Sequence, residues 1–305
     1  MPTMDFYKQI EDNKRMTYLM FLAFFILIGI LAFLISAILG GLNIYGLTYF
    51  SVMGILIIVF AVFSYYSCDS IVTAVSGAKK ADRQQYRQLY NLVEEMCIAG
   101  GLPEPRVFII EDTAINAFAT GRDPQHAVVC VTTGALTLLN RDELQGVIAH
   151  ELSHIKNYDI RTMSIATVLV GVAVLLSDLI LRFALYSRGD SDSKDNKLFI
   201  VLIVVAIILA ALTPLIANMI KLAVSRKREF AADAGSAQMT RNPQGLASAL
   251  EKISKDIEPL EAANKATAHL YIADPLKNTK GLWLKNMFQT HPPIEQRISL
   301  LKGMK

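Results

Sequence analysis

Long apolar runs alternate with polar segments along this chain of 305 residues. Residues 16–68 contain no charged side chain, and this run is too long for one membrane span. It is interrupted by the glycine-rich stretch Gly40–Gly46. Because about 20 apolar residues cross a bilayer as a helix, the pattern predicts two membrane helices, at about residues 18–39 and 47–66. The first run is longer than the apolar region of a signal peptide and lacks a small-residue cleavage site, which favours an uncleaved anchor.

Two further apolar runs lie in the second half of the chain, at residues 162–181 and 198–220. The first of them contains Asp178 near its end, where an acidic residue costs less than the roughly 2.5–3.5 kcal/mol expected at mid-bilayer. The second has no charged residue, and Pro214 is expected to kink it. The pattern therefore predicts four membrane helices in two hairpins.

The segment between the two hairpins, residues 69–161, has the patterns of a folded domain. An amphipathic helix is predicted to begin at Asp82 and to end at Gly100–Gly101. Three short strand patterns follow it, at residues 106–111, 116–120 and 127–132. The turn residues Gly121–Pro124 predict that the last two strands form a hairpin. The predicted order is a helix, a small sheet and then a second helix.

Composition agrees with a membrane protein and excludes one class of partner. Hydrophobic residues make up 53% of the chain, charged residues make up 19%, and the mean hydropathy is +0.38. The formal net charge is only +3, and no stripe of basic and aromatic residues occurs, so we expect no nucleic-acid partner. The expected partners are the lipid bilayer and, from the motif described next, protein substrates. The sequence indicates no oligomeric state.

The second helix of this segment carries the pattern His-Glu-x-x-His. Asn140 followed by Glu143 is a capping-box pattern, which predicts the start of a helix. His150 and His154 are four residues and so about 6 Å of helical rise apart, which lets two imidazoles converge on one metal ion. Glu151 lies beside them, where it can act as a base toward metal-bound water. The alternative is a surface helix that carries these residues by chance.

A site with two histidines needs a third protein ligand and an open position for water. After the fourth apolar run, Glu229 and Asp233 lie one helical turn apart and face the same way. Glu229 is the candidate metal ligand, and Asp233 the candidate acceptor for the free ring nitrogen of a ligand histidine. The alternative is that both carboxylates balance the basic residues Arg226–Arg228 on a solvated face.

A further histidine precedes a pair of prolines. Pro292 and Pro293 stiffen the backbone after His291, and this rigidity could aim the imidazole at a cleft. His126 and His269 are expected to be ordinary surface or core residues.

Basic residues near the membrane helices predict the orientation of the chain. They gather before the first helix, after the second and after the fourth, at Lys8, Lys14, Arg15, Lys79, Lys80, Arg83, Lys221, Arg226, Lys227 and Arg228. The loop at residues 182–197 also carries basic residues, offset by aspartates, and weakens the asymmetry. The positive-inside rule places both termini and the His-Glu-x-x-His helix in the cytoplasm.

The chain resembles the HtpX family of membrane-bound zinc metalloproteases, relatives of the CAAX prenyl proteases. The resemblance is carried by Gly101-Leu102-Pro103, Asn116–Gly121, Thr133–Leu136, HELSHIKNYD at residues 150–159, SRKREFAAD at residues 225–233 and THPPIEQRI at residues 290–298. It implies one Zn²⁺ per chain, with His150, His154 and Glu229 as ligands, Glu151 as the base and Asp233 behind a ligand. It also implies an edge strand that pairs with substrate, formed by Asn116, Ala117, Phe118 and Ala119. His291 is expected to help polarise or orient the scissile carbonyl.

The sequence therefore predicts a mainly α integral membrane protein with four transmembrane helices and a zincin-like α+β metalloprotease domain. That domain is expected to hold a small sheet and the active-site helix. We divide the chain into an N-terminal membrane hairpin, a first protease part, a second membrane hairpin and a second protease part, at residues 1–68, 69–161, 162–220 and 221–305.

The predicted function is zinc-dependent endopeptidase activity. The resemblance further implies a multi-pass protein of a prokaryotic inner membrane that cleaves damaged or misassembled membrane proteins at the cytoplasmic face, in stress response and quality control. One alternative is an intramembrane metalloprotease, although the motif lies outside the apolar runs. The other is a non-catalytic membrane scaffold with structural zinc, which would need four protein ligands.

Overall fold

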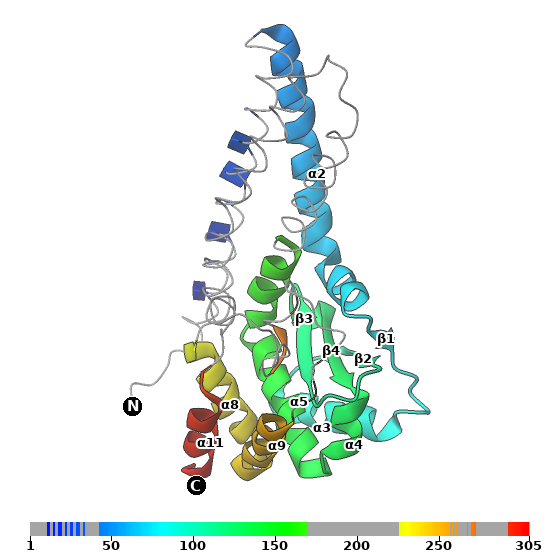
Figure 1. The fold of residues 1–305 in the computed structure, drawn as a ribbon, viewed down its shortest axis with the longest axis vertical. Coiled ribbons are helices and arrows are strands. Elements are labelled where there is room, and N and C mark those ends of the chain that lie inside the picture. Colours follow the sequence, from blue (N-terminus) through cyan, green and yellow to red (C-terminus); the bar gives the residue numbers. More distant parts are fainter. Residues whose placement is uncertain are drawn as a thin grey trace, which may run out of the picture.

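The computed structural model of the chain describes residues 43–169, 226–256, 270–272 and 292–304, with isolated positions between residues 11 and 33 and at 258, 260 and 267. The predicted membrane helix at residues 198–220 lies outside the described residues, as do residues 170–181 of the third. His269 and His291 also lie outside them. In the described part the fold is mostly helical with one small sheet, and one long helix projects from the body (Figure 1).

The projecting helix is α2, Ile44–Val75, and it contains the predicted membrane helix at residues 47–66. The side chain of Asn43 caps it by accepting from the backbone N–H of Tyr45 at 2.9 Å. Its 32 residues span about 48 Å, whereas the hydrocarbon core is about 30 Å thick. Among the described residues α2 is the one helix long and apolar enough to cross a membrane.

The two ends of α2 have different surroundings. Apolar side chains up to Phe63 are largely exposed, which suits contact with lipid tails, whereas Cys68 and Val72 are completely buried. Phe33, one of the isolated helical positions near the N-terminus, packs edge-on against Phe50, with ring centroids 6.1 Å apart. Because Cys68 and Val72 are buried, the second part of α2 belongs to the core of the body.

The sheet has four strands in the order β1-β2-β4-β3. They are β1 Lys79–Lys80, β2 Arg106–Ile110, β3 Ala117–Gly121 and β4 Ala127–Thr132. The predicted strands and the β3–β4 hairpin are confirmed, and the hairpin connection contains a short 3-10 helix, Pro124–His126. β1 was not predicted, and neither was the parallel pairing of β2 with β4.

Each face of the sheet packs against a different layer. Alternate side chains point to opposite faces of a strand, and those of Ala117 and Val129 join a core with helices α3, α5 and α9. Phe118 and Cys130 point to the other face. That second core also contains Val72 of α2, Met163, Leu270 and Tyr271.

Besides the helical residues 159–169, six helices accompany the sheet in the described part of the body. They are α3 Arg87–Gly100, α4 Thr133–Leu138, α5 Arg141–Lys156, α8 Arg226–Thr240, α9 Pro243–Lys255 and α11 Ile294–Lys302. The start of α3 differs from the predicted start at Asp82. The Asp82 carboxylate instead caps a turn, accepting from the N–H groups of Gln84 and Gln85, and the regular helix begins after it.

Helix α5 is the central helix of the body, between β3 on one side and α8 and α9 on the other. A β-carbon at Gly146 would lie 2.6 Å from the backbone nitrogen of Leu246 in α9, so only glycine permits this approach. Ser236 of α8 donates to the Gly146 carbonyl at 2.7 Å. These contacts fix α8 and α9 against the helix that carries the His-Glu-x-x-His pattern.

The chain turns at Asn157–Tyr158 after α5 and is again helical over residues 159–169. This segment includes the start of the third predicted membrane helix. Its Ser164 hydroxyl lies 2.7 Å from the Thr120 hydroxyl and accepts from the Gly121 N–H at 3.0 Å. Residues 162–169 are therefore covered by protein rather than exposed.

Candidate metal centre

The predicted capping box determines where α5 begins. The Asn140 side chain accepts from the Glu143 N–H at 2.9 Å, and the Glu143 carboxylate accepts from the Asn140 N–H at 2.8 Å. Glu143 also accepts from Lys252 and Ser248 of α9, at 2.7 and 2.6 Å. The cap thus fixes the start of the helix and its contact with α9.

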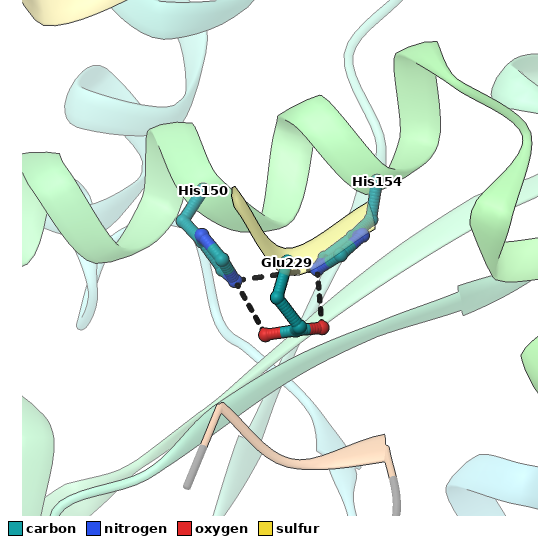
Figure 2. A group of neighbouring side chains, drawn as sticks. All are labelled: His150, His154 and Glu229. Carbon is teal, nitrogen blue, oxygen red and sulfur yellow. Dashed lines mark hydrogen bonds and ion pairs between the residues drawn. The ribbon is translucent and has the colours of Figure 1, made fainter. Parts of the chain in front are cut away.

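His150, His154 and Glu229 converge below α5 (Figure 2). The two histidine Nε2 atoms are 3.2 Å apart. Glu229 Oε2 lies 3.8 Å from the Nε2 of His150, and its Oε1 lies 3.5 Å from the Nε2 of His154. All three side chains are buried, and their donor atoms lie within 4.8 Å of one another. The pair on α5 and the acid on α8 thus meet as the sequence predicted.

The second ring nitrogen of each histidine faces a carboxylate. His150 Nδ1 lies 3.0 Å from Asp233 Oδ1, and His154 Nδ1 lies 3.0 Å from Asp159 Oδ2. Each carboxylate can accept a hydrogen bond from Nδ1–H, and in a neutral ring this leaves the lone pair of Nε2 directed at the shared centre. Asp233 was predicted for this position. Asp159 was not, although it ends the run at residues 150–159, which is one of the segments that carry the family resemblance.

Arg297 completes the cluster, and sequence reasoning gave it no role. Its side chain is 1% exposed and donates to both oxygens of Asp233, at 2.9 and 2.7 Å. Its Nη1 lies 3.5 Å from Glu229 Oε2 and donates to the Ile272 carbonyl at 3.1 Å. The arginine therefore compensates the buried negative charge of the two α8 carboxylates.

Glu151 is buried beside the two histidines. Burial raises the pKa of its carboxyl to about 7, with the neighbouring Glu229 adding to the rise and His154 opposing it. A hydrogen bond from the backbone of Ala119 in β3 also lowers this pKa. A carboxyl with a pKa near neutrality can accept and release a proton at physiological pH.

The two histidines differ in pKa when protein groups alone act on them. Burial lowers the pKa of His150 to about 4, against the effect of Asp233. Burial also acts to lower the pKa of His154, but the Asp159 hydrogen bond and the Glu229 charge raise it to about 9. His150 is therefore a neutral base at pH 7, and His154 holds a proton that a metal ion must displace.

The donor set suits zinc. Two imidazole nitrogens and one carboxylate are ligands that zinc takes in catalytic sites, with bonds of about 2.0–2.2 Å. Two nitrogens on one tetrahedral ion at that bond length lie roughly 3.3 Å apart, and the separation here is 3.2 Å. The group could therefore hold one metal ion without rearrangement of the histidines.

The residues predicted to bind substrate lie next to this centre. Ala117, Phe118 and Ala119 belong to β3, at the edge of the sheet, and Asn116 immediately precedes it. The Asn116 N–H donates to the Thr132 hydroxyl at 3.0 Å.

Known proteins are similar to nearly the whole chain. The model of peptidase family M48 matches residues 83–305. A "Protease HtpX homolog" from Dictyoglomus thermophilum is 44% identical over 98% of this chain and 95% of its own length. Homologues with the same description from Thermoanaerobacter pseudethanolicus and Streptococcus thermophilus are 42% and 40% identical, again over 98% of this chain.

Among solved structures, the crystal structure of S. mikatae Ste24p matches with a TM-score of 0.49 and 18% identity, covering 96% of this chain and 66% of that chain. The sequence matches are far stronger, because they combine high identity with almost complete coverage of both partners. Together with the buried His-His-Glu group, they show that this chain is a membrane-associated metalloprotease that belongs to peptidase family M48.

Proposed function

We propose that the chain is a zinc-dependent endopeptidase in which His150, His154 and Glu229 hold the metal and Glu151 is the catalytic base. The observation that carries this proposal is the convergence of two Nε2 atoms and one carboxylate from helices far apart in the sequence. Each histidine is held by its own carboxylate, Asp233 or Asp159.

Bound zinc would supply a Lewis acid for the scissile carbonyl and lower the pKa of a water molecule. Glu151 receives the proton of that water and delivers it to the leaving nitrogen. Its pKa of about 7 suits both halves of this transfer. Asp159 and Asp233 keep the Nδ1 protons in place, so both imidazoles present Nε2 to the metal.

The donor count favours catalysis over a structural role. A closed structural zinc site uses four protein ligands, whereas a catalytic site keeps a position for water. The group found among the described residues has three members. A buried acid with a pKa near 7 beside them has no use in a purely structural site.

We further propose that the substrates are membrane proteins cut at the cytoplasmic face, in the quality control of damaged proteins. The exposed apolar part of α2 supports an anchor in the bilayer, and its buried part supports a body that lies next to that anchor. Four membrane helices, an inner-membrane location and cytoplasmic termini remain part of this proposal. The division of the chain at residues 68, 161 and 220 and the carbonyl-orienting role of His291 are likewise proposals.

The test uses the purified full chain in detergent, with β-casein and a solubilised membrane protein as substrates. We expect cleavage that is lost with a chelator and restored by added zinc. Glu151→Gln should keep one zinc per chain while losing cleavage, because the substitution removes the base and leaves the metal ligands intact. Cleavage that is indifferent to chelation would refute the zinc mechanism, and full turnover by Glu151→Gln would refute the assignment of the base.

A further inference from the structure

A short segment of the chain lies along the outer edge of β3. The N–H of Ile272 donates to the Ala117 carbonyl at 3.1 Å. Tyr271 is completely buried and packs edge-on against Phe118, with ring centroids 5.0 Å apart. In Figure 1 this segment is the short orange stretch beside the sheet.

The contact occupies the side of β3 that an incoming strand would use. In an antiparallel pair only every second residue hydrogen-bonds to its partner strand, and the others direct their backbone groups outward. Ala117 accepts from Ile272, and Gly121 donates to the Ser164 hydroxyl at 3.0 Å. Between them Ala119 bonds to Glu151. Each of these three outward-facing residues therefore has a backbone group engaged by the chain itself.

Ile272 is held at both its backbone groups. Its N–H is bound by the Ala117 carbonyl, and its carbonyl accepts from Arg297 Nη1, each at 3.1 Å. The same guanidinium binds Asp233, which holds His150. One acceptor on the edge strand and one donor beside the metal centre thus bind the two backbone groups of a single residue.

We propose that the Ala117 carbonyl and Arg297 Nη1 are a substrate-backbone binding pair, and that Ile272 fills it until substrate displaces it. The proposal rests on the proposed endopeptidase function. An extended peptide presents one N–H and one carbonyl per residue, so it can replace Ile272 at both atoms. Arg297 is then a positioning residue, which places one substrate carbonyl relative to the Asp233–His150 pair.

The pair also determines which conformation of a substrate can replace Ile272. When Ile272 leaves, its two hydrogen bonds are lost, and an extended peptide restores both. A folded or helical segment uses its own backbone groups internally and restores neither. The site therefore selects unfolded polypeptide by its backbone, with little dependence on sequence at this position.

The first test separates the Ile272 N–H from its side chain. Ile272→Pro removes both, whereas Ile272→Ala keeps the N–H and serves as the matched control. A hydrogen bond is worth about 0.5–1.5 kcal/mol net, so the proline variant should show a KM for a short β-casein peptide that is about twofold to tenfold lower than that of the alanine variant. The zinc content of the two variants should be equal. An equal or higher KM for the proline variant overturns the proposal.

The second test leaves Ile272 native and does not depend on turnover. Hydrogen exchange is followed in the zinc-loaded Glu151→Gln protein with and without the casein peptide. We expect faster exchange of the amides in residues 270–272 on addition of peptide, and unchanged exchange in α9. The same peptide with N-methylated backbone nitrogens should have no effect, because it cannot donate to Ala117. Unchanged exchange with a peptide that binds overturns the proposal, even if Ile272→Pro fails to fold.

The outcomes distinguish this proposal from the one on which it rests. If the wild-type protein with zinc cleaves no substrate, the endopeptidase function fails. If it cleaves, but the two Ile272 variants share one KM and residues 270–272 stay protected, the displacement of Ile272 fails and the endopeptidase stands.

Discussion

Asp159→Asn tests how far the carboxylate behind His154 controls the metal centre. Asp159 is completely buried, and its Oδ2 lies 3.0 Å from His154 Nδ1. Asparagine has nearly the same shape but no charge. The substitution therefore removes the charge-assisted hydrogen bond without leaving a cavity.

Two effects of this substitution on zinc affinity oppose each other. Loss of a hydrogen-bond partner behind a ligand weakens metal binding by about 10- to 100-fold. Burial acts to lower the pKa of His154, but the same carboxylate, together with the charges of Glu229 and Glu151, raises it to about 9 from an ordinary value of 6.5. At pH 7 a proton therefore competes with zinc for His154. Since each pKa unit above the pH is a tenfold penalty, this competition weakens wild-type binding by about 100-fold at pH 7 and about twofold at pH 9.

The variant should therefore lose affinity only where the proton no longer competes. Without the Asp159 charge the pKa of His154 falls, so the proton competes less with zinc at pH 7, and this gain offsets the lost hydrogen bond. We expect variant and wild type to bind zinc with similar affinity, or the variant more tightly, at pH 7. At pH 9 the variant should be weaker by about 10-fold or more.

The measurement is a competition titration of metal-free protein against a zinc chelator at the two pH values, in one detergent. Asp123→Asn is the matched control, because Asp123 Oδ1 lies 2.7 Å from His126 Nδ1 in the β3–β4 connection, away from the metal centre. It should change nothing. An affinity ratio between Asp159→Asn and wild type that is the same at both pH values would refute the reasoning.

Three further outcomes follow from the geometry. Glu229→Ala should lose zinc, measured as the zinc content per chain. A variant that keeps one zinc per chain would show that another residue is the third ligand. Gly146→Ala should destabilise the body by about 1–3 kcal/mol in thermal unfolding, because its β-carbon would lie 2.6 Å from the Leu246 nitrogen. Gly54→Ala is the control, because its β-carbon would have nothing within 4 Å, and it should leave the stability unchanged. Zinc binding at pH 7.5 should release at least one proton, from His154. The buffer takes up this proton, so the binding enthalpy in calorimetry should depend on the buffer, and an enthalpy that does not would contradict the prediction.

Local signals predicted the elements that position the site. The capping box at Asn140 and Glu143 predicted the start of α5, because the two residues satisfy each other's backbone N–H groups within one turn. The short apolar run of residues 127–132 predicted a strand with the observed bounds, Ala127–Thr132. The spacing of His150 and His154 predicted their convergence, since helical geometry alone brings residues four apart together.

What the sequence left out depends on contacts between distant elements. Arg297 reaches Asp233 only because α11 packs against α8, and no periodicity encodes that approach. Asp159 meets His154 because the chain reverses at Tyr158, whose φ of 60° is rare for a non-glycine residue. β1 is only two residues long, Lys79–Lys80, which is too short for any alternation to show.

The close packing of α8 against α5 explains how two carboxylates of one helix reach the two ring nitrogens of His150. A β-carbon at Gly235 would lie 3.0 Å from the Ser153 β-carbon, so a glycine brings the two backbones together. At that separation Glu229 reaches the Nε2 side of His150, and Asp233, one turn later, reaches its Nδ1. The metal ligands therefore depend on the packing of α5 against α8 as much as on their own chemistry. Any change that separates these helices should release the metal and the Nδ1 contact together.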